Sequence, residues 1–205
     1  MTSRPRLVLA SASPGRLATL RRAGLDPEVV VSGVDESVGP GSVTDTVRCL
    51  ATRKAHAVAA RLSPPSALVL GADSLLELDG TAYGKPASAA EAIARWQRMS
   101  GRSGILHTGH CVVETELGRA VEAVGSTLVR FAEISAAEIE AYVATGEPLH
   151  VAGAFTLDGL GGAFVDGVDG DPHNVVGLSL PLLRRLLADL DVRWYDLWTL
   201  RPPSP

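Results

Sequence analysis

The chain contains few cysteines and no long apolar run, and both absences narrow the possible protein classes. Its two cysteines, Cys49 and Cys111, do not form a CxxC pair. They are too few for a disulfide framework or a structural zinc site, so we expect reduced thiols in a cytoplasmic protein. No apolar run reaches the roughly 18 residues that a membrane span needs. The start of the chain, Met1 to Arg6, leads into a strand rather than a signal peptide. We therefore expect no membrane partner.

The chain also has no excess of positive charge. Its formal net charge is -4 at pH 7, whereas a protein that follows the phosphates of duplex nucleic acid needs a broad basic face. We expect no duplex nucleic acid partner and only small anions as ligands. With 46% hydrophobic and 20% charged residues, the composition is that of a globular protein. We expect residues 1–205 to form a single domain with two lobes around a central cleft.

Lysine is scarce as well. Of the 19 basic residues, 17 are arginine, and only Lys54 and Lys85 are lysine. Lysine carries a compact charge on a flexible stem and arginine a planar fork, so a site that needs the first does not accept the second. The two lysines are therefore candidates for a functional site. The alternative is chance survival on the surface.

Apolar runs, capping residues and turn residues predict a mixed α/β fold, with a twisted sheet flanked by helices. We expect strands at 6–10, 28–34, 67–71, 75–78, 81–83, 106–114, 121–131, 154–157 and 163–168, with a type I′ hairpin at 79–80. We expect helices from the cap at Ser13 to Gly24, at 44–62, from a capping box of Ser88 and Glu91 to Gly101, from a capping box of Ser135 and Glu138 to Gly146, and at 181–190. Ser63-Pro64-Pro65 is expected to end the second helix.

The turn Ser11-Ala12-Ser13-Pro14-Gly15-Arg16 lies where a predicted buried strand ends and a helix begins. Free backbone N–H groups, the positive end of the helix dipole, the hydroxyls of Ser11 and Ser13, and Arg16 all surround this point. Such an arrangement is typical of a phosphate site. The alternative is a capped helix with a solvated arginine.

Lys54 falls within the apolar stripe of its predicted helix, although a cation is expected on the opposite face. The stripe consists of Val47, Leu50, Ala51, Val58 and Leu62. Either the amine runs along the stripe to the surface, or it reaches an anion held in a cleft. The position of Lys85 in the turn Gly84-Lys85-Pro86 favours the second alternative.

Asp73 is the strongest single candidate for catalysis. The apolar strand at 67–70 is expected to place it at a carboxyl end, where open α/β sheets usually bind ligands. A carboxylate there can hold a divalent metal or take a proton from water. Asp35 and Glu36 follow an earlier strand and could supply a second carboxylate. The alternative is that these acids only solvate strand ends.

Other catalytic patterns are absent from the sequence. The segment 80–85 lacks P-loop spacing, no GxGxxG follows a strand, and there is no GxSxG elbow. His107 and His110 are expected to point to opposite faces of a strand, which argues against shared metal ligation. The segment 159–162, Gly-Leu-Gly-Gly, either forms a tight turn or presents its backbone to a ligand.

Several motifs together resemble the Maf family of nucleoside triphosphate pyrophosphatases, once named for septum formation inhibition. They are Leu9-Ala10-Ser11-Ala12-Ser13-Pro14-Gly15-Arg16, Gly71-Ala72-Asp73-Ser74, Gly84-Lys85-Pro86, Ser100-Gly101, Thr108-Gly109, Ala152-Gly153-Ala154-Phe155 and Asn174-Val175-Val176-Gly177-Leu178. They cover nearly the whole chain in order. The resemblance implies an α/β fold similar to the inosine triphosphate pyrophosphatases. It also implies hydrolysis of a nucleoside triphosphate to the monophosphate and pyrophosphate, with clearance of non-standard nucleotides and a link to cell-division arrest.

The same resemblance implies roles for individual residues and a divalent cation, Mg²⁺ or Mn²⁺. Asp73 corresponds to the general base and, with Glu36, to a metal ligand. Lys54 and Lys85 complete the catalytic set, and Ser11, Ser13 and Arg16 bind substrate. A homodimer is a further expectation.

The sequence departs from the better-understood branches of the family at the positions that select the base. The branch that acts on dTTP and UTP has Arg, Thr and Gln where this chain has Gly15, Ser74 and Asp158; the branch linked to 7-methyl-GTP has Trp, Gln and Glu. We expect these three residues to border the nucleobase, whose identity stays open. Two other functions also stay open: a nucleotidyltransferase, and a non-catalytic nucleotide-binding regulator of septum formation.

Overall fold

The computed structural model describes residues 5–62 and 66–199. The predicted helix stop at Ser63-Pro64-Pro65 lies outside the described residues, but the helix ends earlier than predicted, at Ala59 rather than at residue 62. A seven-stranded sheet has the order β2-β1-β3-β5-β6-β7, with β4 paired to β3. Its strands are β1 (Arg6–Leu9), β2 (Glu28–Val29), β3 (Ala67–Leu78), β4 (Thr81–Tyr83), β5 (Ser103–Glu114), β6 (Arg119–Phe131) and β7 (Val165–Asp169). β1 runs parallel to β2 and β3, and the remaining pairs are antiparallel.

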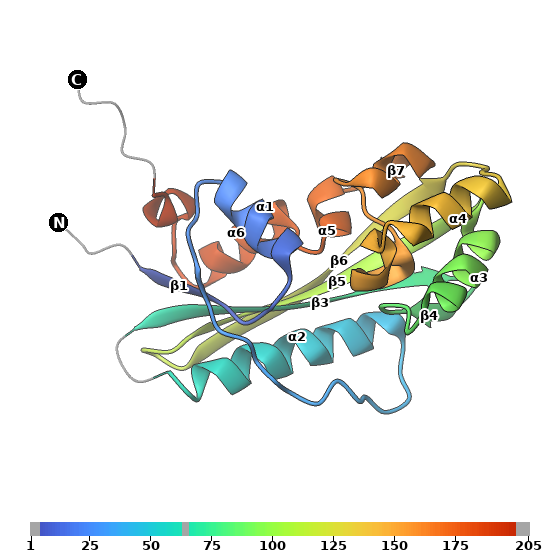
Figure 1. Ribbon diagram of the computed structural model, residues 1–205. Coiled ribbons are helices and arrows are strands. Elements are labelled where there is room, and N and C mark those ends of the chain that lie inside the picture. Colours follow the sequence, from blue (N-terminus) through green and yellow to red (C-terminus); the bar gives the residue numbers. More distant parts are fainter. Residues whose placement is uncertain (1–4, 63–65, 200–205) are drawn as a thin grey trace, which may run out of the picture.

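Helices cover both faces of this sheet, which confirms the predicted α/β class. They are α1 (Pro14–Arg22), α2 (Val43–Ala59), α3 (Ala89–Met99), α4 (Ala136–Ala144), α5 (Pro172–Val176) and α6 (Leu180–Asp189). α2 lies along one face, α1, α5 and α6 lie over the other, and α3 and α4 pack together at one end (Figure 1). Among the residues described, none of these helices combines the length and apolar character needed to cross a membrane.

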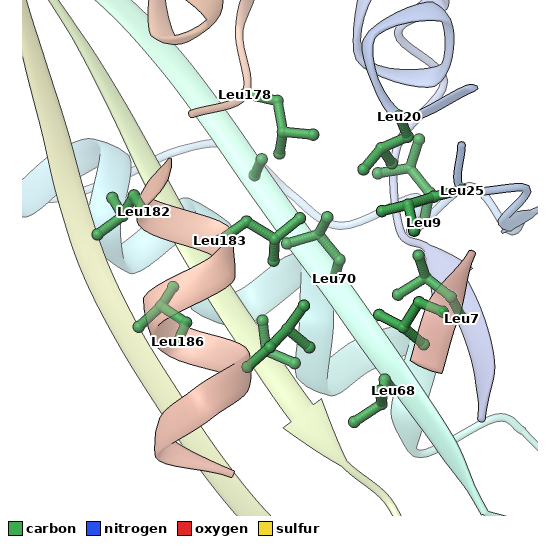
Figure 2. Packing of buried hydrophobic residues seen from close by; sticks show 14 of the residues in the cluster. Leu7, Leu9, Leu20, Leu25, Leu68, Leu70, Leu178, Leu182, Leu183 and Leu186 are labelled. Carbon is green, nitrogen blue, oxygen red and sulfur yellow. The ribbon is translucent and has the colours of Figure 1, made fainter. Parts of the chain in front are cut away.

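Two hydrophobic clusters occupy the same face of the sheet at opposite ends. Side chains two positions apart in a strand share a face. Leu68, Leu70 and Ala72 of β3 belong to the cluster under α6, whereas Leu76 and Leu78 belong to the cluster around Trp96 and Phe131. Figure 2 shows the leucines of β1, β3 and α6 that meet in the first cluster. Ser74 falls between the two clusters on the same face, so a polar position separates the two apolar ends.

Most predicted helix ends are confirmed. Ser13, Ser88 and Ser135 each accept a hydrogen bond from the backbone N–H three residues later. The predicted stops Gly24, Gly101 and Gly146 all have positive φ, as does the Asp79-Gly80 turn of the hairpin. Ser135 and Glu138 form the full capping box. The predicted box of Ser88 and Glu91 is incomplete, because the Glu91 carboxylate accepts from Ala87 N rather than from the N–H of Ser88.

The predicted strands at 67–71 and 75–78 are one continuous strand, β3. Two further predicted strands are wrong in extent or in kind. β2 spans only Glu28–Val29 instead of 28–34, because its partner β1 ends at Leu9 and offers no further residues to pair with. The segment 154–157 is not a strand. Gly153 and Ala154 have φ values of 76° and 61° and belong to a 3₁₀ turn, Ala152–Ala154, and such values are incompatible with extended backbone.

Candidate active site

Asp73 lies in the middle of β3, not at the carboxyl end of a strand as the sequence predicts. The apolar run ends at residue 70, but β3 continues because β5 pairs with residues 68–77. On the opposite edge, β1 pairs with residues 67–70 and β4 with residues 76–78. Within the described ranges, no strand covers residues 71–75 on that edge. Asp73 is therefore at the centre of a gap in strand pairing along this edge of β3, at residues 71–75. The segments that leave β1 and β4 border this gap.

Lys54 of α2 reaches Asp73 from one face of the sheet. Its Nζ lies 2.5 Å from Asp73 Oδ1 and 2.7 Å from Glu36 Oε1. The side chains of Lys54 and Asp73 are 9% and 12% exposed, so the amine does not run to the surface. Of the two acids expected to supply a second carboxylate, Glu36 does so. The Asp35 carboxylate instead accepts from the backbone N–H of Ser37.

Two glycines bring α2 close enough for this contact. A Cβ added at Gly71 of β3 or Gly109 of β5 would collide with backbone atoms of α2. Gly109 is the cross-strand neighbour of Asp73, so the helix backbone passes directly over the sheet beside the carboxylate. A larger residue at either position would move α2, and Lys54 with it, away from the sheet.

Arg16 of α1 enters the same gap from the other face. Its Nε donates to Gly177 O at 2.8 Å, Nη1 to Ser11 Oγ at 3.0 Å and Nη2 to Ser74 Oγ at 3.0 Å. Burial lowers the pKa of Arg16, an effect that the charges of Asp73 and Glu36 oppose. The predicted phosphate turn and the predicted acid cluster therefore meet, one from each side of β3.

Ser74 belongs to a hydrogen-bond chain that the sequence analysis missed. Its Oγ lies 2.9 Å from Thr108 Oγ1, and Thr108 donates to the carbonyl of Asn174. Because Thr108 has one hydroxyl proton, Ser74 donates to Thr108 while accepting from Arg16. Thr108 and Asn174 stand in motifs that resemble the Maf family, and that resemblance was the only signal in the sequence that pointed to them.

His110 lies next to this chain and is fully buried. Its Nε2 accepts from the backbone N–H of Ser179, so Nδ1 carries the proton that Thr108 O accepts. Burial and the nearby Arg16 cation lower the pKa of His110 to about 4. His107, by contrast, contacts Ser126 and Glu77, so the two histidines have separate partners.

The other predicted site residues lie around the gap. Lys85 is exposed in the turn that follows β4. Ser13 caps α1 and accepts from the Arg16 N–H. A Cβ at Gly15 would lie 3.4 Å from Val176 O, so Gly15 packs beside α5. Asp158 lies 3.5 Å from Arg22 at the far end of α1.

The glycine-rich segment 159–162 is held by Glu147. The two carboxylate oxygens of Glu147 accept from the N–H groups of Leu160 and Gly161. They also accept from the hydroxyls of Tyr142 and Thr156. These backbone groups are thus turned towards a side chain of the protein itself, which favours the tight-turn alternative over a ligand-facing backbone.

The family model described as Maf-like protein matches residues 6–190. The chain belongs to the Maf family. A nucleoside triphosphate pyrophosphatase from Salinispora tropica is 59% identical over 98% of this chain and 92% of that protein. A protein of the same description from Streptomyces coelicolor is 60% identical over 97% of this chain and 98% of that protein. Another, from Thermosynechococcus vestitus, is 55% identical over 93% of this chain and 96% of that protein. Among solved structures, the Staphylococcus aureus Ham1 protein shares 18% identity over 62% of this chain and 72% of that one, at a TM-score of 0.43. The family assignment rests on the sequence relatives.

The divalent cation implied by resemblance to the Maf family fits the residues present. Glu36 and Asp73 bond to the same Lys54 Nζ through one oxygen each, which leaves Glu36 Oε2 and Asp73 Oδ2. Carboxylate oxygens suit Mg²⁺ and Mn²⁺, and Mg²⁺ is usually held by one or two carboxylates together with substrate phosphates. No cluster of three or more His, Cys, Asp or Glu side chains suited to a metal occurs in residues 5–62 and 66–199. A cation that arrives with a polyphosphate therefore fits better than one in a protein cage.

Proposed function

We propose that this Maf-family protein hydrolyses a nucleoside triphosphate to the monophosphate and pyrophosphate. The observation that carries the proposal is the joint approach of Lys54 and Arg16 to the gap around Asp73, from opposite faces of the sheet. A polyphosphate chain needs cations along its length, and a water molecule that attacks it needs a base. Relatives described as nucleoside triphosphate pyrophosphatases, 50–60% identical over most of the chain, support the same activity.

In this proposal, the Asp73 carboxylate orients the attacking water and takes its proton. The water oxygen forms a bond to phosphorus, the bond to the oxygen bridging the α and β phosphates breaks, and its electron pair leaves with one of the two products. Lys54 holds Oδ1 of Asp73, which fixes the direction of the carboxylate. Such fixed positioning lowers the entropic part of the barrier.

Cationic groups bind the triphosphate. Arg16 is fixed by three hydrogen bonds, so it loses little side-chain freedom when a phosphate binds. Ser11 and Ser13 line the start of α1, and Lys85 borders the opposite side of the gap. When bound by Asp73 and Glu36, a divalent cation supplies Lewis-acid stabilisation of charge on the phosphate oxygens.

The nucleobase lies, in this proposal, beside Gly15, Ser74 and Asp158. The Asp158 carboxylate is an acceptor only, which favours base edges that present an amino donor, such as those of guanine and cytosine, over the acceptors of thymine. We also propose a cytoplasmic protein, one domain over the whole chain, and a homodimer. The link to cell-division arrest stays a prediction.

A substrate panel tests the function against its two alternatives. Purified protein is incubated with Mg²⁺ or Mn²⁺ and common or modified nucleoside triphosphates, without any acceptor. We expect catalytic release of pyrophosphate from at least one nucleotide. A nucleotidyltransferase would need an acceptor, and a non-catalytic regulator would bind nucleotide without turnover, so either of these results contradicts the proposal.

A further inference from the structure

Lys85 stands in a turn whose backbone is held on both sides by one ion pair of α3. Arg95 Nη1 donates to Gly84 O at 2.6 Å, directly before Lys85. Glu91 Oε2 accepts from Ala87 N at 2.8 Å, two residues after it. Arg95 Nη2 and Glu91 Oε1 are joined at 2.6 Å. The pair therefore brackets the exposed lysine.

The burial of Arg95 is unusual for a residue that pairs with a surface acid. Its side chain is 3% exposed, whereas that of Glu91 is 47% exposed. Its Nε is buried with no hydrogen-bond partner in the described chain, and its guanidinium lies over the Tyr83 ring at 4.9 Å. Burying the Arg95 charge with an unpaired donor costs free energy, and a pair with a half-exposed acid is weak grounds for a stabilising role. A positional role accounts for the arrangement better.

The geometry of the turn is further restricted by its neighbours. Gly84 O also accepts from Gly153 N at 3.0 Å, and Trp96, next to Arg95, donates to Ala154 O at 2.7 Å. A Cβ at Gly84 would lie 3.5 Å from Leu75, which is at the end of the gap in β3. α3 thus fixes the turn against the strand that carries Asp73.

We propose that Arg95, together with Glu91, is a positioning residue that sets the backbone direction of Lys85 towards the triphosphate. This inference rests on the proposed function, because it assigns Lys85 to the substrate. Arg95 itself acts through the Gly84 carbonyl and through Glu91, and not on the substrate. Lysine at position 95 carries a single ammonium group and lacks the planar fork, so it does not hold Gly84 O and Glu91 together.

A double-mutant cycle in kcat/KM tests this role. We expect Arg95→Met to lower kcat/KM by about tenfold in the wild-type background, within the range that small misplacement of a reacting group produces. In a Lys85→Met background the same change should lower it less than twofold, since there is no longer a lysine to position. Arg98→Met is the matched control, because Arg98 is an exposed arginine of the same helix whose guanidinium donates to the Tyr83 hydroxyl and makes no hydrogen bond to the turn at 84–87. We expect this variant to retain kcat/KM.

Thermal unfolding of each variant separates positioning from loss of fold. If Arg95→Met does not fold, Glu91→Gln replaces it, and the same disappearance of its effect in the Lys85→Met background is expected. If Arg95→Met lowers kcat/KM by the same factor in the wild-type and Lys85→Met backgrounds, the positioning role is overturned, but Lys85 stays in the site. A Lys85→Met variant with wild-type kcat/KM would overturn both this inference and the assignment of Lys85 to the substrate.

Discussion

Asp73 combines burial, a fixed cationic partner and one free oxygen, and this combination distinguishes it from every other acid near the gap. Glu36 shares Lys54 but is largely exposed, Asp35 is engaged by its own loop, and Asp158 faces Arg22. A single substitution at Asp73 therefore separates chemistry from binding.

We expect Asp73→Asn to abolish most turnover and leave nucleotide affinity largely intact. Asparagine keeps the shape but neither accepts a proton nor carries charge. General-base losses run to roughly 10²–10⁴-fold. Single-turnover kinetics and nucleotide binding by calorimetry measure the two effects, with Asp35→Asn as the control. A variant that keeps more than about a tenth of the wild-type kcat, a loss under roughly 1.4 kcal/mol, would show that Asp73 is not the base.

The two lysines should not tolerate arginine. The Lys54 side chain is 9% exposed and its Nζ fits between two carboxylates, where the longer planar guanidinium cannot keep both contacts. We expect Lys54→Arg and Lys85→Arg each to lower kcat/KM by about tenfold or more, as expected when a point charge is replaced by a fork. Arg185→Lys is the control, because Arg185 lies on the exposed face of α6. Wild-type kinetics in both lysine variants would mean that any cation suffices.

Asp158 should affect the choice of base. Asp158→Asn adds a donor where the wild type has only acceptors, so we expect kcat/KM to shift towards dTTP or UTP by about 1–3 kcal/mol of discrimination. The exposed ion pair with Arg22 contributes little by comparison. Both enzymes are compared over one nucleotide panel, with Asp166→Asn as the control. Parallel profiles would show that Asp158 does not contact the base.

At the scale of elements, α2 crosses closely over β3 and β5 because Gly71 and Gly109 have no side chains. We expect Gly109→Ala to destabilise the protein by about 1–3 kcal/mol, the usual cost of overpacking, and to lower kcat as Lys54 moves from Asp73. Gly39→Ala is the control, because a Cβ there meets no atom within 4 Å. Urea unfolding measures the change. Unchanged stability and kcat in Gly109→Ala would mean that the helix does not need this close approach.

The elements also show what local sequence does and does not determine. Helix starts at Ser13 and Ser135 follow from side chains that act within three residues, and they were predicted correctly. The extent of β2 and β3 depends instead on which strands lie beside them, so residues 30–34 leave the sheet and Asp73 is inside a strand. At 154–157 the positive φ values of Gly153 and Ala154 come from packing that local patterns do not report.

The site as a whole depends on contacts across the entire chain. Arg16 bonds to Gly177, 161 residues away, and to Ser74, 58 residues away. Residue type and strand position predicted the phosphate turn, the lysines and the acid pair, but not that Arg16 and Lys54 approach from opposite faces. The roles of Thr108, His110 and Arg95 did not follow from the sequence, because they depend on backbone carbonyls and N–H groups, which almost every residue carries.

At the scale of the whole molecule, the lowered pKa of the buried His110 makes the free energy of unfolding depend on pH. Its folded pKa of about 4 lies below the unfolded value of about 6.5, so the unfolded state binds the extra proton between these values. The free energy of unfolding therefore falls as pH drops through this window, by about 2 kcal/mol between pH 7.5 and pH 5 from this group. We expect His110→Asn to reduce the pH dependence by that amount in urea unfolding, with His173→Asn as the exposed control. An unchanged slope would mean that His110 is not kept neutral by the fold.

The central claim is that water splits the bond between the α and β phosphates in this site. The most direct test is ³¹P NMR of the reaction with Mg²⁺ and a nucleoside triphosphate in ¹⁸O-enriched water. We predict nucleoside monophosphate and pyrophosphate in equal amounts, with one ¹⁸O atom from solvent incorporated per turnover, and formation of both products roughly 10²–10⁴-fold slower with Asp73→Asn. Nucleoside diphosphate and orthophosphate as products, or products without solvent oxygen, would contradict the account.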